Sequence, residues 1–480
     1  MRTPRLALNL AVALALGITA APASSAALSN GDLETAARLR DNASAGSNAW
    51  DIVESLTTEV GPRMGGSEAD PRAVAWAVAK FQSLGFDRVW TEPVTFPNWR
   101  RDRETARVLS PYPQPLHVTT LGGSVGTDAD AIEAEVVEFA DLAALGAAPE
   151  HSLDGKIAYV SYRMKRSRDG NGYGPAVAAR VDGASQAARK GALALLIRSV
   201  GTDHDRLPHT GVMQYAEPDA AATAPLPQIP AAALSNPDAD LLSNMIRRGQ
   251  PVRLSLDLAV GPGAEVTSYN VIGEITGSEH PEQVVVIGGH LDSWDLGTGA
   301  IDDGAGVAIT MAAGAMIGAL PAPPKRSIRV IAYANEERGL FGGKAYAKRY
   351  ADQTDNHVLG AESDFGAGRI YALRAGVADS ARPLIAQIGE VLAPLGIVTE
   401  TTGGGPGPDV GPMAAQGMAW AQLAQDGTDY FDYHHTANDT LDKIDPHALD
   451  QQVAAYAVLA YLAAQAEGGF GHPASTAAGK

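Results

Sequence analysis

The chain contains no cysteine among its 480 residues. This absence excludes disulfide bonds, thiol nucleophiles, cysteine-ligated zinc sites and the acylated cysteine of a lipoprotein. Any transition metal must therefore be held by histidine and carboxylate side chains, a ligand set that suits Zn²⁺ or a similar first-row ion.

Positive charge is also scarce, since 37 lysine and arginine residues stand against 55 aspartate and glutamate residues, for a formal net charge of -18. Nucleic acids and anionic membranes would be repelled over most of such a surface, so we expect neither as a partner. An apolar content of 45% with 19% charged residues is typical of a soluble globular enzyme. After the N-terminal region, no segment approaches an uninterrupted apolar span of membrane length.

The first 26 residues have the pattern of a secretory signal peptide. Arg2 and Arg5 precede an apolar run over residues 6–20, which is followed by small residues ending in Ala26. The run is too short and wrongly flanked for a membrane anchor. The sequence therefore predicts that residues 1–26 are removed and that the protein is secreted or periplasmic.

The remaining chain is long enough for two or three domains. Residues 266–470 alternate strand and helix patterns, which predicts an α/β fold with a mixed, mostly parallel sheet flanked by helices. Residues 111–265 have shorter, β-rich segments separated by proline and glycine, which predicts an inserted domain. We expect residues 27–110 to be the N-terminal part of the catalytic domain and residues 471–480 to be a flexible tail.

The expected elements follow from apolar periodicity and from capping residues. After a polar leader, helices are expected at 50–59 and 71–84, and a strand at 88–91. In the insert we expect strands at 134–137, 156–160 and 192–197 and one helix at about 183–190. The catalytic part should contain strands at 283–287, 327–333, 357–361 and 418–423, a helix at 304–320, and a C-terminal helix with Asp445 as N-cap and Pro446 in its first turn.

Metal-binding side chains follow these four strands at the point where each strand ends, which is where open α/β sheets collect their ligands. Each short motif alone is weak evidence, because such residues often form solvated turns or charged helix starts. Their occurrence at successive strand ends favours one common site. In chain order the candidates are His290, Asp292, Asp302, Glu336, Glu337, Asp364, His434 and His435.

This inventory fits a two-metal hydrolytic site, in which one carboxylate bridges ions about 3.5–4 Å apart. With Asp302 as the bridge, one ion would take His290 and Asp364, and the other would take Glu337 and His435. Glu336, beside a ligand but free of metal, would take a proton from the attacking water and pass it to the leaving amine. Asp292 would accept the second imidazole N–H of His290 and fix its tautomer.

The motifs Gly-Gly-His290-Leu-Asp292, Gly-Ala-Ile-Asp302-Asp303-Gly, Asn-Glu336-Glu337-Arg-Gly, Glu-Ser-Asp364 and His434-His435-Thr-Ala-Asn-Asp439-Thr together resemble the di-zinc aminopeptidase and glutamate carboxypeptidase superfamily. Within it, the chain is most similar to the plasma glutamate carboxypeptidase, or carboxypeptidase Q, family. Further similarity lies outside the site, at Gly61-Pro62-Arg63, Gly191-Ala192-Leu193 and Pro208-His209-Thr210-Gly211, and covers nearly all of the chain after residue 26.

This resemblance implies a zinc exopeptidase that acts on dipeptides or short peptides, with two Zn²⁺ per chain, a protease-associated-type insert and a homodimeric state. The family's ligands fall on His290, Asp302, Glu337, Asp364 and His435, with Glu336 as the base. His435 rather than His434 stands four residues before Asp439, as the family spacing requires.

Other interpretations remain open at this stage. Residues 122–126 match the nucleophile-elbow pattern of serine hydrolases, but no helix pattern follows them, so we expect a loop. Alternatives on the same scaffold are an aminopeptidase, a glutaminyl-cyclase-like acyltransferase with one zinc ion, and a noncatalytic binding protein. The glycine-rich loop 403–407 with Asp409 either contacts substrate or forms a surface turn, and His209 either approaches the cleft or is a satisfied loop histidine. The spacing of the motifs does not show whether the enzyme recognises the free amino terminus or the free carboxyl terminus of its substrate.

Overall fold

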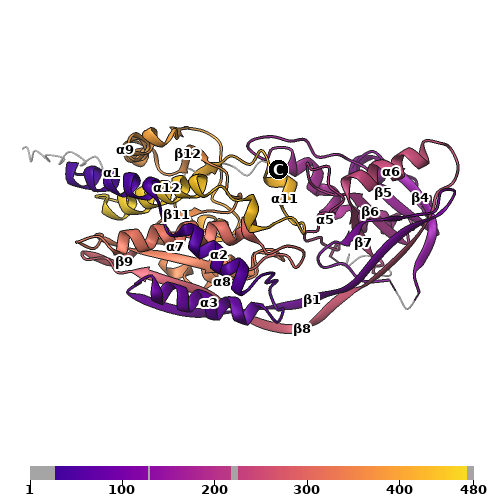
Figure 1. The fold of residues 1–480 in the computed structure, drawn as a ribbon, viewed down its shortest axis with the longest axis horizontal. Helices are drawn as coiled ribbons and strands as arrows, with labels where there is room; N and C mark the ends of the chain where they lie inside the picture. The colour runs from indigo at the N-terminus through magenta and orange to yellow at the C-terminus, as the bar shows by residue number, and fades with distance from the viewer. Residues whose placement is uncertain (1–27, 128–129, 218–224, 473–480) are drawn as a thin grey trace, which may run out of the picture.

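A computed structural model describes residues 28–127, 130–217 and 225–472 of the chain. The expected signal peptide and most of the expected tail lie outside the described residues. Two lobes are joined by a pair of long antiparallel strands, β1 (Arg88–Ser110) and β8 (Arg253–Ile275) (Figure 1). The second lobe contains the chain between these strands, residues 111–252.

The first lobe is built on a mixed sheet, which confirms the predicted fold class. Its central strands, β14 (Trp420–Gln425), β11 (His357–Glu362), β9 (His280–His290) and β10 (Arg326–Tyr333), lie side by side and are parallel. β12 (Ile370–Gly376) and β8 flank them in the antiparallel direction, and the short β13 (Val398–Thr399) adds to β12. The carboxyl ends of the four parallel strands therefore meet at one edge of the sheet.

Both faces of this sheet are covered, as the continuous apolar runs of the central strands require. In β9, Val285 and Ile287 share one core with helices α7 and α12, whereas Val284 and Val286 share another with Tyr346 of α8. Alternate residues of a strand point to opposite faces, so the two cores follow from the strand geometry. The helices of this lobe are α1 (Asn30–Ala45), α2 (Ala49–Glu59), α3 (Asp70–Ser83), α7 (Ala305–Gly318), α8 (Phe341–Arg349), α9 (Arg382–Leu392), α10 (Gly411–Ala414), α11 (Tyr430–Tyr433) and α12 (Pro446–Gln465).

Two helices test expectations about long apolar segments. The helical stretch Ala300–Gly318 has the length and composition of a membrane span, which corrects the expectation that no later segment approaches one. However, 89% of its apolar window is buried, as in the core helix of a globular protein. At α12, Asp445 accepts a hydrogen bond from the backbone of His447 and Pro446 is the first residue, as predicted.

The second lobe continues the same extended sheet through the far ends of β1 and β8. Its strands β4 (Ile132–Phe139), β5 (Lys156–Val160), β6 (Ala194–Arg198) and β7 (Ala231–Leu234) are parallel, and the short β2 (Gln114–Leu116) and β3 (Val118–Thr120) complete it. Helices α4 (Leu142–Gly146), α5 (Tyr173–Arg189) and α6 (Asn236–Ile246) cover the sheet. The α6 face has a core of its own, whereas the buried residues of α4 and α5 continue the core of the first lobe. The expected boundary at residue 265 falls inside β8, because β1 and β8 run from one lobe into the other without interruption.

Several expected elements are wrong in extent. The segment after residue 29 is not a polar leader but helix α1, whose apolar positions are largely alanine and therefore gave a weak pattern. The strand expected at 88–91 continues to Ser110, because its second half pairs with β8 and contains charged residues that hide the alternation. The helix expected at 183–190 begins at Tyr173. Residues 122–126 form a loop as predicted, and the Ser124 hydroxyl hydrogen-bonds to backbone groups of Val125 and Ala231.

Candidate metal centre

The structure brings all five predicted ligands together at the carboxyl edge of the parallel strands. His290 is the last residue of β9, Glu337 follows β10 and Asp364 follows β11. His435 comes after α11, which follows β14, and Asp302 lies in the tight segment Ala300–Gly304 that leads into α7. Four of the five side chains are nearly inaccessible to solvent, and the Asp364 side chain is 10% exposed.

Asp302 lies between the two histidines and faces each with a different carboxylate oxygen. Its Oδ1 is 3.1 Å from Nε2 of His290, and its Oδ2 is 3.3 Å from Nε2 of His435. Asp364 lies 3.6 Å from Nε2 of His290, and Glu337 lies 3.0 Å from Nε2 of His435. The donors thus form two groups that share Asp302, as a bridging carboxylate requires.

The two histidines are oriented by hydrogen bonds from their other ring nitrogens, as is usual for metal-binding imidazoles. Nδ1 of His290 donates to the backbone oxygen of Asp292 at 2.9 Å, whereas the Asp292 carboxylate is 3.6 Å away. The carboxylate accepts instead from the backbone N–H of Glu336 at 3.0 Å. Asp292 therefore lies beside His290 as expected, with its carbonyl as the nearer acceptor for Nδ1, and its carboxylate also anchors the turn that carries Glu336.

His434 stacks on His435 with ring centroids 3.5 Å apart, and its Nε2 is 3.7 Å from Asp302. Asp302, His434 and His435 are close enough to form a metal-binding group of their own. His435 lies closer to Asp302 and also contacts Glu337, which favours it as the ligand. Nδ1 of His434 is buried without a hydrogen-bond partner among the described residues.

Three residues to which the sequence arguments gave no role hold the backbone around Asp302 and His290 in place. The Asp439 carboxylate accepts the backbone N–H groups of Ile301 and Asp302 at 2.7 and 3.2 Å. Asp303 accepts the backbone N–H of His290 at 3.1 Å. Arg63, fully buried, donates to backbone oxygens of the 291–299 loop, including that of Thr298 at 2.7 Å. Arg63 and Asp439 belong to the sequence motifs above, but spacing alone cannot show which backbone groups they bind.

Burial and the charges of neighbouring groups shift the pKa values of the carboxyl groups in the site. Burial alone would raise the pKa of Asp302, but the hydrogen bond from His290 and the nearby imidazoles of His435 and His434 outweigh it and hold this pKa well below its usual range. Burial raises the pKa of Glu337 to about 7, with the charge of His435 opposing. Burial, together with the negative charges of Asp364 and Glu337, raises the pKa of Glu336 well above its usual range. Such a cluster of perturbed carboxyl groups is typical of a functional site.

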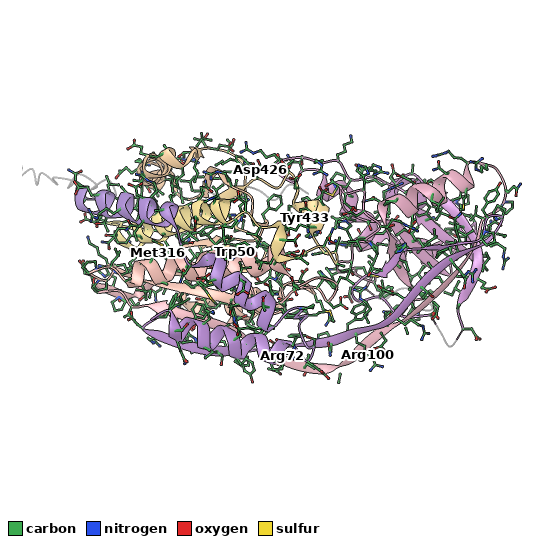
Figure 2. All side chains as sticks on the ribbon, in the orientation of Figure 1. Trp50, Arg72, Arg100, Met316, Asp426 and Tyr433 are labelled. Atoms are coloured by element: carbon green, nitrogen blue, oxygen red, sulfur yellow. The ribbon has the colours of Figure 1, made fainter. Side chains whose placement is uncertain are left out.

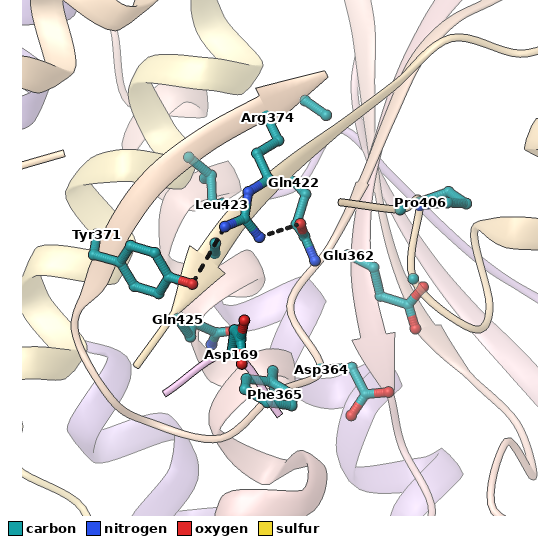
Figure 3. A pocket seen from close by; sticks show the side chains of 14 residues that line it. Asp169, Glu362, Asp364, Phe365, Tyr371, Arg374, Pro406, Gln422, Leu423 and Gln425 are labelled. Atoms are coloured by element: carbon teal, nitrogen blue, oxygen red, sulfur yellow. Dashed lines mark hydrogen bonds between the residues drawn. The ribbon is translucent and has the colours of Figure 1, made fainter. Parts of the chain in front are cut away.

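A small pocket of about 80 Å³ opens beside Asp364 (Figure 3). Its walls include Phe365, Gln422 and Arg374, and the second lobe contributes Asp169. Arg374 is paired with Glu400 at 2.7 Å, so part of its charge is already neutralised. The glycine-rich loop predicted at 403–407 lines this pocket through residues 405–407 and is therefore not a plain surface turn.

The donor set fits one or more transition-metal ions. Oδ2 of Asp302 and Oε1 of Glu337 are buried without a hydrogen-bond partner in the part of the chain that the structure describes. Buried carboxylate oxygens are costly unless they are paired or bound to a metal. Nitrogen and carboxylate oxygen ligands without sulfur suit zinc in a catalytic rather than a structural site.

The chain was compared with known proteins. Residues 270–460 match the model of Peptidase family M28. Carboxypeptidase Q of Bos taurus is 35% identical over 422 residues, which cover 87% of this chain and 86% of that protein. Carboxypeptidase Q of Xenopus laevis is 36% identical, with coverage of 85% and 84%.

Solved structures agree with these matches. The crystal structure of a peptidase M28 precursor from Shewanella amazonensis SB2B has a TM-score of 0.89 at 51% identity and covers 93% of this chain and 100% of that chain. BSAP, a zinc aminopeptidase from Bacillus subtilis, has a TM-score of 0.62 at 19% identity, with coverage of 85% and 93%, and shows similarity of fold alone.

The fold and its clustered histidines and carboxylates define a metallo-exopeptidase of mixed α/β architecture. The similarity to its relatives extends over both lobes and is not limited to the metal-binding residues. The chain belongs to the carboxypeptidase Q group of Peptidase family M28, which confirms the resemblance drawn from its motifs.

Proposed function

We propose that the protein binds two zinc ions per chain and hydrolyses dipeptides or short peptides from one end, as a dipeptidase or carboxypeptidase. The observation that carries this proposal is the position of Asp302, whose two oxygens face the Nε2 atoms of two different histidines at 3.1 and 3.3 Å. One ion would be held by His290, Asp302 and Asp364, and the other by Asp302, Glu337 and His435. The name of the relatives, carboxypeptidase Q, supports the substrate class.

The bound ions would polarise the scissile carbonyl and increase the acidity of the attacking water. The protein's own residues supply positioning and proton transfer. Glu336 takes a proton from the water and passes it to the leaving amine, and the upward shift of its pKa favours holding the proton between these two steps. The pocket beside Asp364 receives a part of the substrate next to the scissile bond.

Metal analysis combined with a panel of dipeptides tests this proposal. We expect about two zinc ions per chain, and hydrolysis that is lost with a chelator and restored by zinc. Peptides with a blocked amino or carboxyl terminus decide between a carboxypeptidase and an aminopeptidase. One ion per chain together with cyclisation of N-terminal glutamine would favour an acyltransferase, and two ions without any hydrolysis would favour a binding protein.

The proposal includes export and a homodimer. Export is supported by the N-terminal charge and apolar pattern, and the dimer by the family resemblance. Sequencing the N-terminus of the exported protein, and measuring its mass in solution, test these two points.

A further inference from the structure

The second lobe reaches the candidate metal centre along residues 426–439, the segment that carries His435. It also packs on Trp294 through Val212 and lines the pocket beside Asp364 through Asp169. The loop between β6 and β7 approaches this segment from one side, with Thr202 donating its backbone N–H to the oxygen of Phe431 at 2.9 Å. The loop before α5 approaches it too, with Arg166 paired to Asp432 at 2.6 Å and Arg168 to Asp426 at 3.0 Å. Asp426 and Tyr433 lie where the two lobes meet (Figure 2).

Three hydrogen bonds between the lobes involve His434 and His435 directly. Nδ1 of His209 donates to the backbone oxygen of His434 at 2.7 Å, and the backbone N–H of Thr210 donates to the oxygen of His435 at 3.0 Å. Nδ1 of His435 in turn donates to the backbone oxygen of Thr210 at 3.3 Å. Thus the ring orientation of one proposed zinc ligand is set by a residue of the other lobe, whereas that of His290 is set by its own loop.

His435 has a left-handed backbone, with φ of 61°. A residue other than glycine rarely adopts this conformation without support from its surroundings. The hydrogen bonds from His209 and Thr210 fall on the carbonyl groups on either side of the His435 Cα, so they restrain the backbone at this point.

His209 is itself held in place. It is 1% exposed, and its Nε2 is 2.7 Å from the Asp203 carboxylate, which also accepts from Asn236 at 2.9 Å. Burial would raise the pKa of Asp203, but these hydrogen bonds lower it and keep the carboxylate charged. The ring lies flat against Gly201, where an added Cβ would stand 2.2 Å from ring atoms. His209 is therefore both a satisfied loop histidine and a contact toward the cleft.

We propose that Asp203 and His209 form a positioning pair in the second lobe that holds His435 in its ligand geometry. The affinity for the ion bound by Glu337 and His435 then depends on this lobe. The affinity for the ion bound by His290 and Asp364 does not. This inference rests on the proposed two-zinc function. Residues that orient a metal ligand through hydrogen bonds commonly change metal affinity by about 10- to 100-fold.

Two substitutions of His209 separate the hydrogen bond to His434 from that to Asp203. In His209→Asn the amide nitrogen takes the place of Nδ1 and can still donate to the His434 oxygen. In His209→Gln the amide reaches toward Asp203 and leaves the His434 oxygen without its donor. Gly201→Ala provides a third variant, which displaces the ring without changing it. His117→Ala is the matched control, because it removes the Nδ1 side-chain bond of another histidine–aspartate pair of the same lobe, to Asp238, that does not contact the 426–439 segment.

The full-length variants are titrated with zinc against a competing chelator, and folding is checked by thermal unfolding. We expect His209→Gln and Gly201→Ala to weaken one of two ions by about 10- to 100-fold while the other is unchanged. His209→Asn and His117→Ala should remain close to the wild type. If every folded variant binds both ions with equally high affinity, or if both affinities fall equally, the positioning role is overturned while the proposed two-zinc function still stands. Fewer than two ions in the wild type would overturn the proposed function and this inference with it.

Discussion

The adjacent carboxyl groups of Glu336 and Glu337 meet different surroundings at the end of β10. Glu337 contacts His435, whereas Glu336 is half-buried and its pKa is raised by burial and by the charges of Asp364 and Glu337. We therefore expect Glu336→Gln to retain the bound zinc but to lose at least about 10²- to 10⁴-fold in kcat, the usual worth of a proton-transferring group. Metal analysis and steady-state kinetics check this, with the exposed Glu279→Gln as control. Near-normal turnover would remove Glu336 from the mechanism.

The neighbouring histidines allow a second test at the level of single residues. His435→Ala should lose one of two zinc ions and reduce activity by more than about 100-fold, because even residues that only orient a ligand cost 10- to 100-fold. His434→Ala should keep both ions, since its ring is farther from Asp302 than that of His435. Zinc content after dialysis measures the difference. The opposite pattern would identify His434 as the ligand.

The start of β11 is joined to α8 by a buried histidine, which gives an element-level prediction. Nε2 of His357 accepts from the hydroxyl of Tyr346 and Nδ1 donates to the oxygen of Gln353, both at 2.9 Å, so the neutral ring satisfies both contacts. Burial lowers the pKa of His357 to about 4. Below pH 6.5, the ordinary pKa of histidine, His357 is protonated in the unfolded chain but stays neutral in the folded chain. The free energy of unfolding therefore falls by about 3 kcal/mol in all as the pH drops from 6.5 to 4.

Urea unfolding over this pH range checks the prediction. His357→Gln should remove this part of the pH dependence, whereas substitution of the exposed His280 by Gln should leave it intact. A wild type and a His357 variant with the same pH dependence would contradict the assignment.

The central strands could be predicted from sequence because their apolar runs are long and buried on both faces. Their ends place the proposed ligands, so His290, Glu337 and Asp364 could be singled out from the sequence. The alanine-rich α1 and the charged half of β1 were missed, because their positions are set by packing against α12 and pairing with β8. The bonds from His209 and Thr210 to the His434–His435 segment join residues more than 200 positions apart, and no local pattern encodes such contacts.

At the scale of the whole molecule, the long strands β1 and β8 and the 426–439 segment both connect the lobes (Figure 1). The strands connect the lobes covalently, whereas the contacts at the segment are hydrogen bonds, ion pairs and aromatic packing next to the candidate metal site. The lobes should therefore be coupled to metal binding through this segment rather than through the strands.

Removal of the metal tests this coupling. Zinc that binds only the folded state stabilises it by about 4 kcal/mol per ion at a free concentration 1,000 times the Kd, so a chelator should lower Tm and added zinc should raise it with the logarithm of its concentration. The metal-free site would also leave the buried oxygens of Asp302 and Glu337 uncompensated. In hydrogen exchange, chelation should increase exchange in residues 426–439 and also in 201–213 of the second lobe, while β5 and α6 in its core stay protected. Exchange that increases only in the first lobe would show that the metal centre is independent of the second lobe, because the bonds from His209 and Thr210 would then transmit nothing between them.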